Sequence, residues 1–136
     1  MGKTTLCIEN VSMVFPGVRA LDRVNMEVSG GEITALIGVN GAGKSTLMNI
    51  LGGVYRATEG RILINGEEAR IHSPQDAERY GIGFIHQEPV MFSFMSVAEN
   101  IFLSKLKSGV NYRRLNEEAK KYLSMMGCDI RPSAKV

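Results

Sequence analysis

Apolar residues of this chain gather in two short runs. Residues 32–37 and 82–87 are apolar at most positions, and the runs end at Ile37 and at the polar Gln87. Short apolar runs of this kind predict strands of a parallel sheet that is covered on both faces. We therefore expect both runs to be buried strands of an α/β core.

Elsewhere apolar and polar residues alternate. Residues 6–11 and 24–28 show this alternation on either side of the turn dipeptide Pro16–Gly17, which predicts two antiparallel strands. Residues 61–71 contain two further short strands around Asn65–Gly66, the strongest short hairpin signal. The first part of the chain is thus expected to carry an antiparallel sheet.

Helix signals mark four segments. An N-cap followed by proline opens the second segment, at Ser73 and Pro74, and a capping box opens the third, at Ser96 and Glu99. Glycines close the first, second and fourth segments. The predicted helices cover residues 44–51, 73–80, 96–103 and 112–126.

The last predicted helix is amphipathic. Its charged residues are expected to face water, and Gly127 is expected to end it. The apolar residues expected to share its buried face are Leu115, Ala119, Tyr122, Leu123 and Met126.

Composition narrows the class of protein. With 136 residues, of which 44% are hydrophobic, the chain is long enough for one ordinary domain with a core. A net charge of +2 is too small to indicate a nucleic-acid partner. No apolar run approaches the ~20 residues of a membrane span, so we expect a soluble protein of the cytoplasm. Cys7 and Cys128 stand far apart and are expected to be reduced thiols.

A phosphate-binding motif follows the first apolar run. Its fixed pattern, G-x-x-x-x-G-K-[ST], needs glycines that tolerate positive φ so that backbone N–H groups can turn toward phosphate oxygens. Lys44 supplies a positive charge for the β- and γ-phosphates, and the Ser45 hydroxyl is a ligand for Mg²⁺. The N-terminus of the helix that follows adds its dipole. The residues expected to contact the nucleotide here are Gly38, Val39, Asn40, Gly41, Ala42, Gly43, Lys44, Ser45 and Thr46.

Several classes of protein use this motif. A GTPase would need D-x-x-G and N-K-x-D sequences downstream, and Asp22, Asp76 and Asp129 fit neither. A small-molecule kinase would need an arginine-rich lid and an acidic acceptor site, which nothing after Gln87 suggests. A non-catalytic module with a vestigial phosphate loop stays open as an alternative, and nucleotide titration would separate it from a nucleotide-binding protein.

Four stretches together resemble the ATP-binding subunit of an ABC transporter. The phosphate loop reads Gly-x-Asn-Gly-Ala-Gly-Lys-Ser-Thr-Leu, a wording typical of that family. Residues 15–21 resemble its adenine-stacking loop in the form found in monosaccharide importers, residues 81–88 its Q-loop, and residues 96–103 the stretch after it. The resemblance covers nearly the whole chain.

The resemblance implies a fold, a cofactor and site residues. It implies an incomplete α/β P-loop NTPase core of the ABC ATPase type, with an N-terminal antiparallel β subdomain, over about 1–88, and the start of a helical subdomain, over about 96–136. It implies ATP and Mg²⁺ as ligands, with Phe15 and Val18 at the base. Gln87 would contact Mg²⁺ or the attacking water, and Lys44 and Gln87 would serve catalysis. For Phe15 alone, packing in the core is the simpler interpretation.

The resemblance also implies partners. These are a second ATP-binding cassette and a membrane-spanning permease subunit, which would place the protein on the cytoplasmic face of the membrane. An apolar loop after Gln87 is expected to receive the permease, unless its side chains fill the core beneath the next helix. The residues expected to make this contact are Pro89, Val90, Met91, Phe92, Phe94 and Met95.

Three family features are missing from the 136 residues. They are the signature near Ser-Gly-Gly-Gln, the apolar strand ending in Asp-Glu, and the switch histidine. We therefore expect the N-terminal piece of the first of two tandem cassettes, which binds ATP but does not hydrolyse it alone. A nucleoside or another small solute in place of a sugar would leave the residues of this piece much the same. We also expect residues 32–37 and 82–87 to lack neighbouring strands, so that the piece is marginally stable, aggregates or dimerises.

Overall fold

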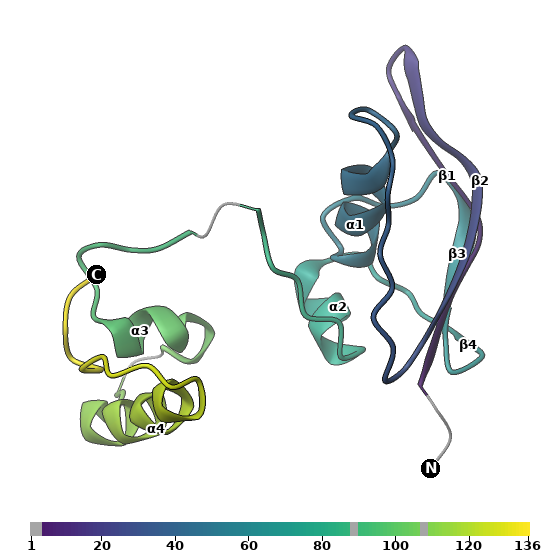
Figure 1. Ribbon diagram of the computed structural model, residues 1–136. Coiled ribbons are helices and arrows are strands. Elements are labelled where there is room, and N and C mark those ends of the chain that lie inside the picture. The colour runs from purple at the N-terminus through teal and green to yellow at the C-terminus, as the bar shows by residue number, and fades with distance from the viewer. Residues whose placement is uncertain (1–3, 88–89, 107–108) are drawn as a thin grey trace. The chain divides into compact units, whose positions relative to one another are not determined.

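The computed structural model describes residues 4–87, 90–106 and 109–136, with only the backbone of Lys105. Its contacts divide the chain into two compact units, Met1–Ile85 and His86–Val136, which are described separately below (Figure 1).

An antiparallel sheet forms one layer of the first unit. Its strands are β1 (Thr5–Phe15), β2 (Val18–Ser29), β3 (Glu59–Ile64) and β4 (Glu67–Glu68), in the order β2-β1-β3-β4. The predicted antiparallel strands are confirmed, and β1 and β2 are longer than the alternation indicated. In the confirmed hairpin between β3 and β4, Asn65 and Gly66 have φ of 54° and 83°, as a type I′ turn requires.

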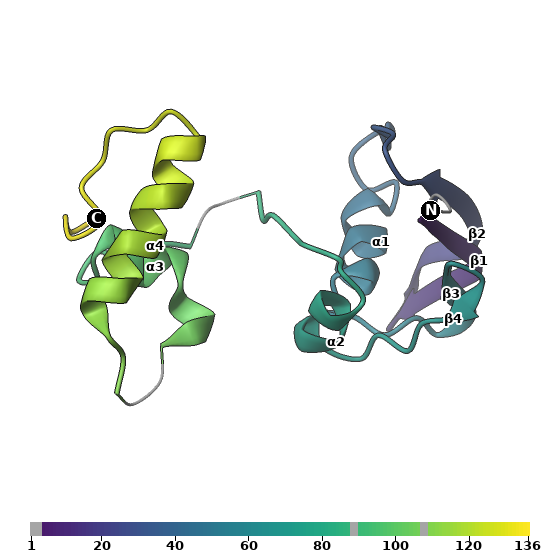
Figure 2. The same ribbon diagram turned by 90° about the horizontal axis from the view of Figure 1, so that it is seen from below.

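Helices α1 (Lys44–Leu51) and α2 (Pro74–Arg79) lie along one face of this sheet (Figure 2). Both were predicted, and the Ser73 hydroxyl accepts from the Asp76 N–H as the N-cap of α2. The helices form because apolar side chains on α1 pack against apolar side chains of the sheet. The main buried residues of this core are Ile8, Val11, Leu21, Leu47, Ile50, Leu51, Ile62 and Ile71.

The predicted buried strands at 32–37 and 82–87 do not form. Neither segment is part of a strand, and Ile33, Ile37 and Ile85 are 103%, 90% and 96% exposed. A strand is stable only with a hydrogen-bonded neighbouring strand, and none of the described strands pairs with either segment. Both segments are apolar, but the prediction that they form strands is wrong.

The second unit is helical. It contains α3 (Val97–Ile101), the 3₁₀ turn η1 (Leu103–Lys105) and α4 (Tyr112–Met125). The predicted capping box is present, since the Ser96 N–H donates to the Glu99 carboxylate at 2.7 Å and the Glu99 N–H to the Ser96 hydroxyl at 3.3 Å. The buried residues that join α3 and α4 are Ala98, Phe102, Leu115 and Ala119.

The buried face of α4 is narrower than predicted. Leu115, Ala119 and Leu123 are buried at a spacing of four residues, whereas Tyr122 is 46% and Met126 77% exposed. The element that α4 packs against, α3, has only five residues and covers a single stripe of the longer helix. None of the helices that the structure describes is long and apolar enough to cross a membrane.

Candidate functional site

The phosphate loop joins the extended segment 33–39 to α1 and turns through glycines. Gly41 and Gly43 have φ of 82° and 87°, a conformation that favours glycine. Gly38 was expected to share it and does not. A Cβ at Gly38 would lie 3.3 Å from the Cβ of Ala42, a tight contact that a small shift of the loop would relieve.

Gly43 also brings the loop against the sheet. A Cβ at this position would lie 2.5 Å from the carbonyl oxygen of Ala20 and 2.7 Å from Cδ2 of Leu21, both in β2. Any larger residue at Gly43 would have to move the loop or the strand. The phosphate loop and the hairpin β1–β2 are therefore in direct contact through a position that only glycine fills without distortion.

The Lys44 side chain folds back over the loop. Its ammonium group donates to the carbonyl oxygens of Gly38 at 2.6 Å and Val39 at 2.8 Å. These neutral acceptors hold the charge inside the curve of the loop, and no described carboxylate pairs with it. A phosphate group can compete for this ammonium because charge-assisted hydrogen bonds are stronger than bonds to neutral carbonyls.

Backbone donors gather at the start of α1. The Ala42 N–H closes a turn onto Val39 and the Leu47 N–H bonds Gly43. Between them, the N–H groups of residues 43–46 have no acceptor among the described residues. Unpaired donors at the positive end of a helix dipole are the set that phosphate oxygens require, so this loop fits a phosphate chain. The Ala42 N–H, which was expected to contribute, is already used by the loop itself.

The residue expected to hold Mg²⁺ is Ser45. Ser45 is exposed in the first turn of α1, next to the unpaired N–H groups. Among the described residues no cluster of His, Cys, Asp and Glu could hold a metal ion. A hydroxyl and phosphate oxygens, completed by water, suit Mg²⁺, which keeps several waters when bound.

Phe15 and Val18 face each other at the end of the hairpin β1–β2. Val18 is 61% exposed, whereas Phe15 is half-buried. The Phe15 ring meets the ring of Tyr55 edge to face, with centroids 5.5 Å apart. Nothing in the sequence indicated this contact, because Phe15 and Tyr55 are forty residues apart in the chain.

Gln87 lies outside the first unit. It is an exposed residue in a bend of the second unit, next to residues 88–89, which the structure does not describe. Because each unit is described by itself, the structure does not bring Gln87 together with Lys44. Its expected role at Mg²⁺ or water thus remains a prediction.

The apolar loop after Gln87 is described from Val90 onward, so the expected contact at Pro89 lies outside the described residues. Val90, Met91 and Phe94 are 77%, 60% and 68% exposed. Phe92 and Met95 are half-buried, and the rings of Phe92 and Phe94 meet edge to face at 5.9 Å.

Asn100 in α3 fixes the shape of this loop. Its side-chain oxygen accepts from the Phe92 N–H at 2.8 Å, and its amide donates to the carbonyls of Phe92 and Ser96, both at 3.0 Å. The loop is therefore held by polar contacts, while most of its apolar side chains face solvent.

Comparisons with known sequences show which proteins this chain is similar to. The sequence model of a family described as ABC transporter matches residues 21–135. The ribose import ATP-binding protein RbsA of Clostridium perfringens is 48% identical over an alignment of 143 positions, which covers 100% of this chain and 28% of that protein. The ribose import ATP-binding protein RbsA 1 of Agrobacterium fabrum is 44% identical over an alignment of 133 positions, which covers 95% of this chain and 26% of that protein. The chain thus spans about a quarter of the length of these curated relatives.

Solved structures similar to this chain belong to the same family. A nucleotide-free ATP-binding cassette from an ABC transporter matches with a TM-score of 0.79 and 28% identity over 97% of this chain and 57% of its own. The protein cbiO1 of Clostridium perfringens, part of the ABC transporter complex cbiONQ, matches with a TM-score of 0.74 and 25% identity over 96% of this chain and 53% of its own. These likenesses confirm the predicted fold class, a partial P-loop NTPase of the ABC ATPase type.

Proposed function

Since this chain belongs to the ABC transporter family, we propose that it binds ATP with Mg²⁺ as part of an ATPase that powers the import of a sugar. The observation that carries this proposal is the set of unpaired N–H groups at residues 43–46 beside the Lys44 ammonium. The sugar is inferred from the relatives, which are named for ribose import.

Phosphate binding uses groups that the loop already presents. The N–H groups of residues 43–46 would donate to phosphate oxygens, and Lys44 would exchange the carbonyls of Gly38 and Val39 for the β- and γ-phosphates. Ser45 would hold Mg²⁺, which neutralises phosphate charge. Because the donors sit on a short loop closed by its own hydrogen bonds, little reorganisation is needed on binding.

The base would be held by contact with ring faces and not by hydrogen-bond readout. Phe15 and Val18 lie at the end of the hairpin that touches the loop at Gly43. An aromatic face stacks on any purine, so ITP should bind nearly as well as ATP.

Hydrolysis needs more than the 136 residues contain. Phosphoryl transfer to water needs an oriented nucleophile and neutralisation of developing charge. Lys44, Ser45 and Gln87 supply part of this. A catalytic carboxylate and a signature sequence from a second cassette would supply the rest. The chain alone is therefore proposed to bind ATP without turning it over.

The partners follow from the same proposal. The cassette would pair with a second cassette and work at the cytoplasmic face of the membrane, against a membrane-spanning subunit. Three apolar side chains of the loop after Gln87, those of Val90, Met91 and Phe94, are exposed and available for that subunit. Methionine suits a contact that changes shape, because its side chain is flexible and polarizable.

Calorimetry with Mg-ATP tests the proposal. Lys44→Ala should weaken binding by at least about 2 kcal/mol, roughly thirtyfold in Kd, because it removes a charge-assisted interaction. Lys120→Ala, a change of the same kind on the exposed face of α4, should leave the affinity unchanged. Equal affinity of the two variants would contradict the proposal, and so would phosphate release by the purified chain that Lys44→Ala abolishes.

The partner loop is tested in the complete transporter. Phe94→Ser should reduce sugar-coupled ATP hydrolysis and assembly while leaving ATP binding intact, since the side chain is 68% exposed. Met125→Ser, at an apolar residue exposed to 75% in the same unit, is the control. Unimpaired transport in Phe94→Ser, or unfolding of the cassette, would show that the loop is not a contact for the membrane subunit.

A further inference from the structure

Three neighbouring strands of the first unit leave the regular strand conformation at the same level of the sheet. Asn10 in β1, Arg23 in β2 and Gly60 in β3 have φ of 51°, 45° and 87°. β1 carries an extra residue against β2 between Ile8 and Val11 and against β3 between Glu9 and Ser12. β2 in turn carries an extra residue against β1 at Arg23, between Val24 and Leu21. Such a bulge bends and twists a strand and can re-aim the side chains beyond it.

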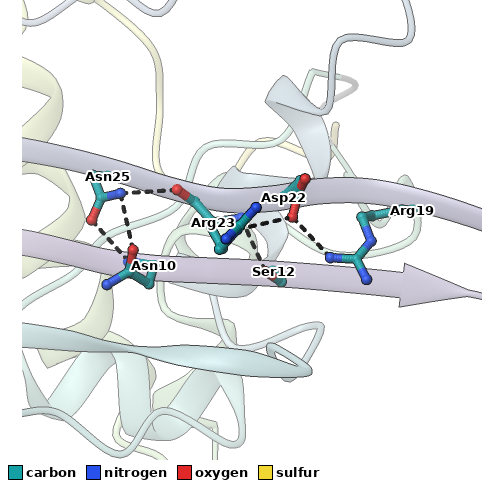
Figure 3. A network of polar contacts seen from close by, with 6 residues as sticks. All are labelled: Asn10, Ser12, Arg19, Asp22, Arg23 and Asn25. Carbon is teal, nitrogen blue, oxygen red and sulfur yellow. Dashed lines mark hydrogen bonds and ion pairs between the residues drawn. The ribbon is translucent and has the colours of Figure 1, made fainter.

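The two left-handed residues that are not glycine are stabilised reciprocally (Figure 3). The Asn10 N–H donates to the side-chain oxygen of Asn25 in β2 at 2.9 Å, and the Arg23 N–H donates to the Ser12 hydroxyl in β1 at 3.0 Å. The Asn25 amide also donates to the carbonyl of Arg23 at 2.9 Å. Each strand thus supplies the side chain that satisfies the irregular backbone of the other.

The third strand leaves room for this arrangement. A Cβ at Gly60 would collide with the carbonyl oxygen of Asn10, so β3 can approach the bulge only because this residue is glycine. Ser12 is fully buried, and its carbonyl accepts from the Thr58 N–H at 2.9 Å. Left-handed conformations outside glycine persist only where the surroundings determine them, and here three strands do so.

The part of the hairpin beyond the bulge carries the residues proposed for the base. It runs from Val11 to the turn at Pro16–Gly17 and back to Arg23, and it holds Phe15 and Val18 at its end. Phe15 lies three residues beyond Ser12, or ~10 Å along an extended strand, so a small change of direction at the bulge moves its ring appreciably.

The same outer hairpin touches the phosphate loop. The register of β2 shifts again next to Ala20, and the carbonyl of Ala20 is the atom that Gly43 approaches. The direction of the hairpin therefore fixes where Phe15 stands relative to the loop that would hold the phosphates.

We propose that Ser12 and Asn25 are positioning residues for the nucleotide base: through the bulge they aim the outer hairpin so that Phe15 meets the base while the phosphates occupy the loop. This inference rests on the proposed binding of ATP. A positioning role predicts weaker binding only of ligands that carry a base. A purely structural role of the bulge predicts the same loss of affinity for ligands with and without a base.

Calorimetry with Mg-ATP and with magnesium tripolyphosphate, which lacks base and ribose, separates the two roles. Asn25→Ala and Ser12→Ala should weaken ATP binding roughly five- to tenfold, as Phe15→Ala should, because the stacking contact is lost. Tripolyphosphate affinity should stay within about twofold, since the phosphate loop is unchanged. The double variant Phe15→Ala with Asn25→Ala should bind ATP no more weakly than Phe15→Ala alone.

Asn65→Ala is the matched control. Asn65 also accepts from a backbone N–H of β1, that of Thr5, but at the opposite end of the strand from the hairpin tip. Asn65→Ala should leave the ratio of the ATP affinity to the tripolyphosphate affinity unchanged. If Asn25→Ala does not fold, Asn25→Asp can replace it, because it keeps an acceptor for the Asn10 N–H. Asn25→Asp should lower the ratio of ATP to tripolyphosphate affinity by less than the roughly five- to tenfold expected for Asn25→Ala.

The possible failures are distinguishable. Unchanged ratios in the Ser12 and Asn25 variants, or equal losses for both ligands, would overturn the positioning role and leave the proposed function standing. Tripolyphosphate binding that survives Lys44→Ala, or no binding of ATP by the original chain, would contradict the proposed function and with it this inference.

Discussion

The two flanks of the phosphate loop behave differently. Behind the loop, α1 is formed, and Leu47 and Ile50 are 3% and 2% exposed. Ahead of it, the segment 33–39 is equally apolar, yet it pairs with none of the described strands, and Ile33 and Ile37 are almost fully exposed. A helix satisfies its hydrogen bonds within itself, whereas a strand depends on a neighbour elsewhere in the chain.

The N–H groups proposed to bind phosphate lie on the flank whose backbone hydrogen bonds are made within the helix itself. The unpaired N–H groups belong to residues 43–46, and the loop ahead of them is closed by short-range bonds to Gly38 and Val39. Nucleotide binding should therefore be less sensitive to the state of the segment 33–39 than to the packing of α1. Changes on the two flanks provide the means to test this difference.

The largest expected effect is a loss of stability when a buried side chain of α1 is truncated. Leu47→Ala should destabilise the first unit by about 2–5 kcal/mol, the usual cost of a cavity in a packed core. Ile33→Ala should change the free energy of unfolding by no more than about 0.5 kcal/mol, because the side chain is fully exposed. Urea unfolding measures both. Equal losses would mean that Ile33 is buried in solution.

A pair of glycines gives the next effect. Gly43→Ala should cost about 3 kcal/mol, since it combines a left-handed φ with contact against Ala20. Gly41→Ala has the same φ constraint but nothing within 4 Å of the added Cβ, so about 1 kcal/mol is expected. Thermal unfolding distinguishes the two. A smaller loss of stability for Gly43→Ala than for Gly41→Ala would show that the phosphate loop does not contact β2.

The smallest effect concerns another locally closed feature, the capping box of α3. Hydrogen bonds from the Ser96 backbone N–H and hydroxyl hold the pKa of Glu99 below its ordinary value of 4.5. Because the pKa is lower in the folded state, the ionised carboxylate stabilises α3 at pH values above about 4.5, and this contribution disappears as the pH falls through the folded pKa.

Amide signals of α3 recorded by NMR between pH 3 and pH 6 follow this transition. Glu99→Gln should flatten the pH dependence of α3 unfolding, while Glu117→Gln, at an exposed residue of α4, should preserve it. The same pH dependence in both variants would contradict the role given to Glu99.

The features that the sequence predicted well are those with local causes. Asn65–Gly66 dictates its own turn because both residues accept positive φ, and Ser96 and Glu99 cap a helix through bonds that span three residues. The phosphate loop and its helix belong to the same class. Each of these could be predicted because the interacting residues are close together in the chain.

The features that escaped prediction depend on distant residues. Arg23 in the middle of β2 gives no local signal of its left-handed conformation, and Asn10 gives only the general tolerance of asparagine for positive φ, because the side chains that stabilise both residues lie on the opposite strand. The exposure of Tyr122 follows from the shortness of α3, and that of Ile33 from the lack of a described neighbouring strand. Periodicity reveals which residues are apolar but not what covers them.

Amide hydrogen exchange with and without Mg-ATP tests the contrast between the flanks most directly. The free chain should show fast exchange at residues 33–39 and slow exchange at Ile50 and Leu51, whose amides lie in the helical hydrogen-bond ladder. Adding Mg-ATP should slow exchange at residues 43–46 and leave residues 33–36 unchanged. Slow exchange at 33–36 in the free chain, or no protection of residues 43–46 by Mg-ATP, would contradict the account.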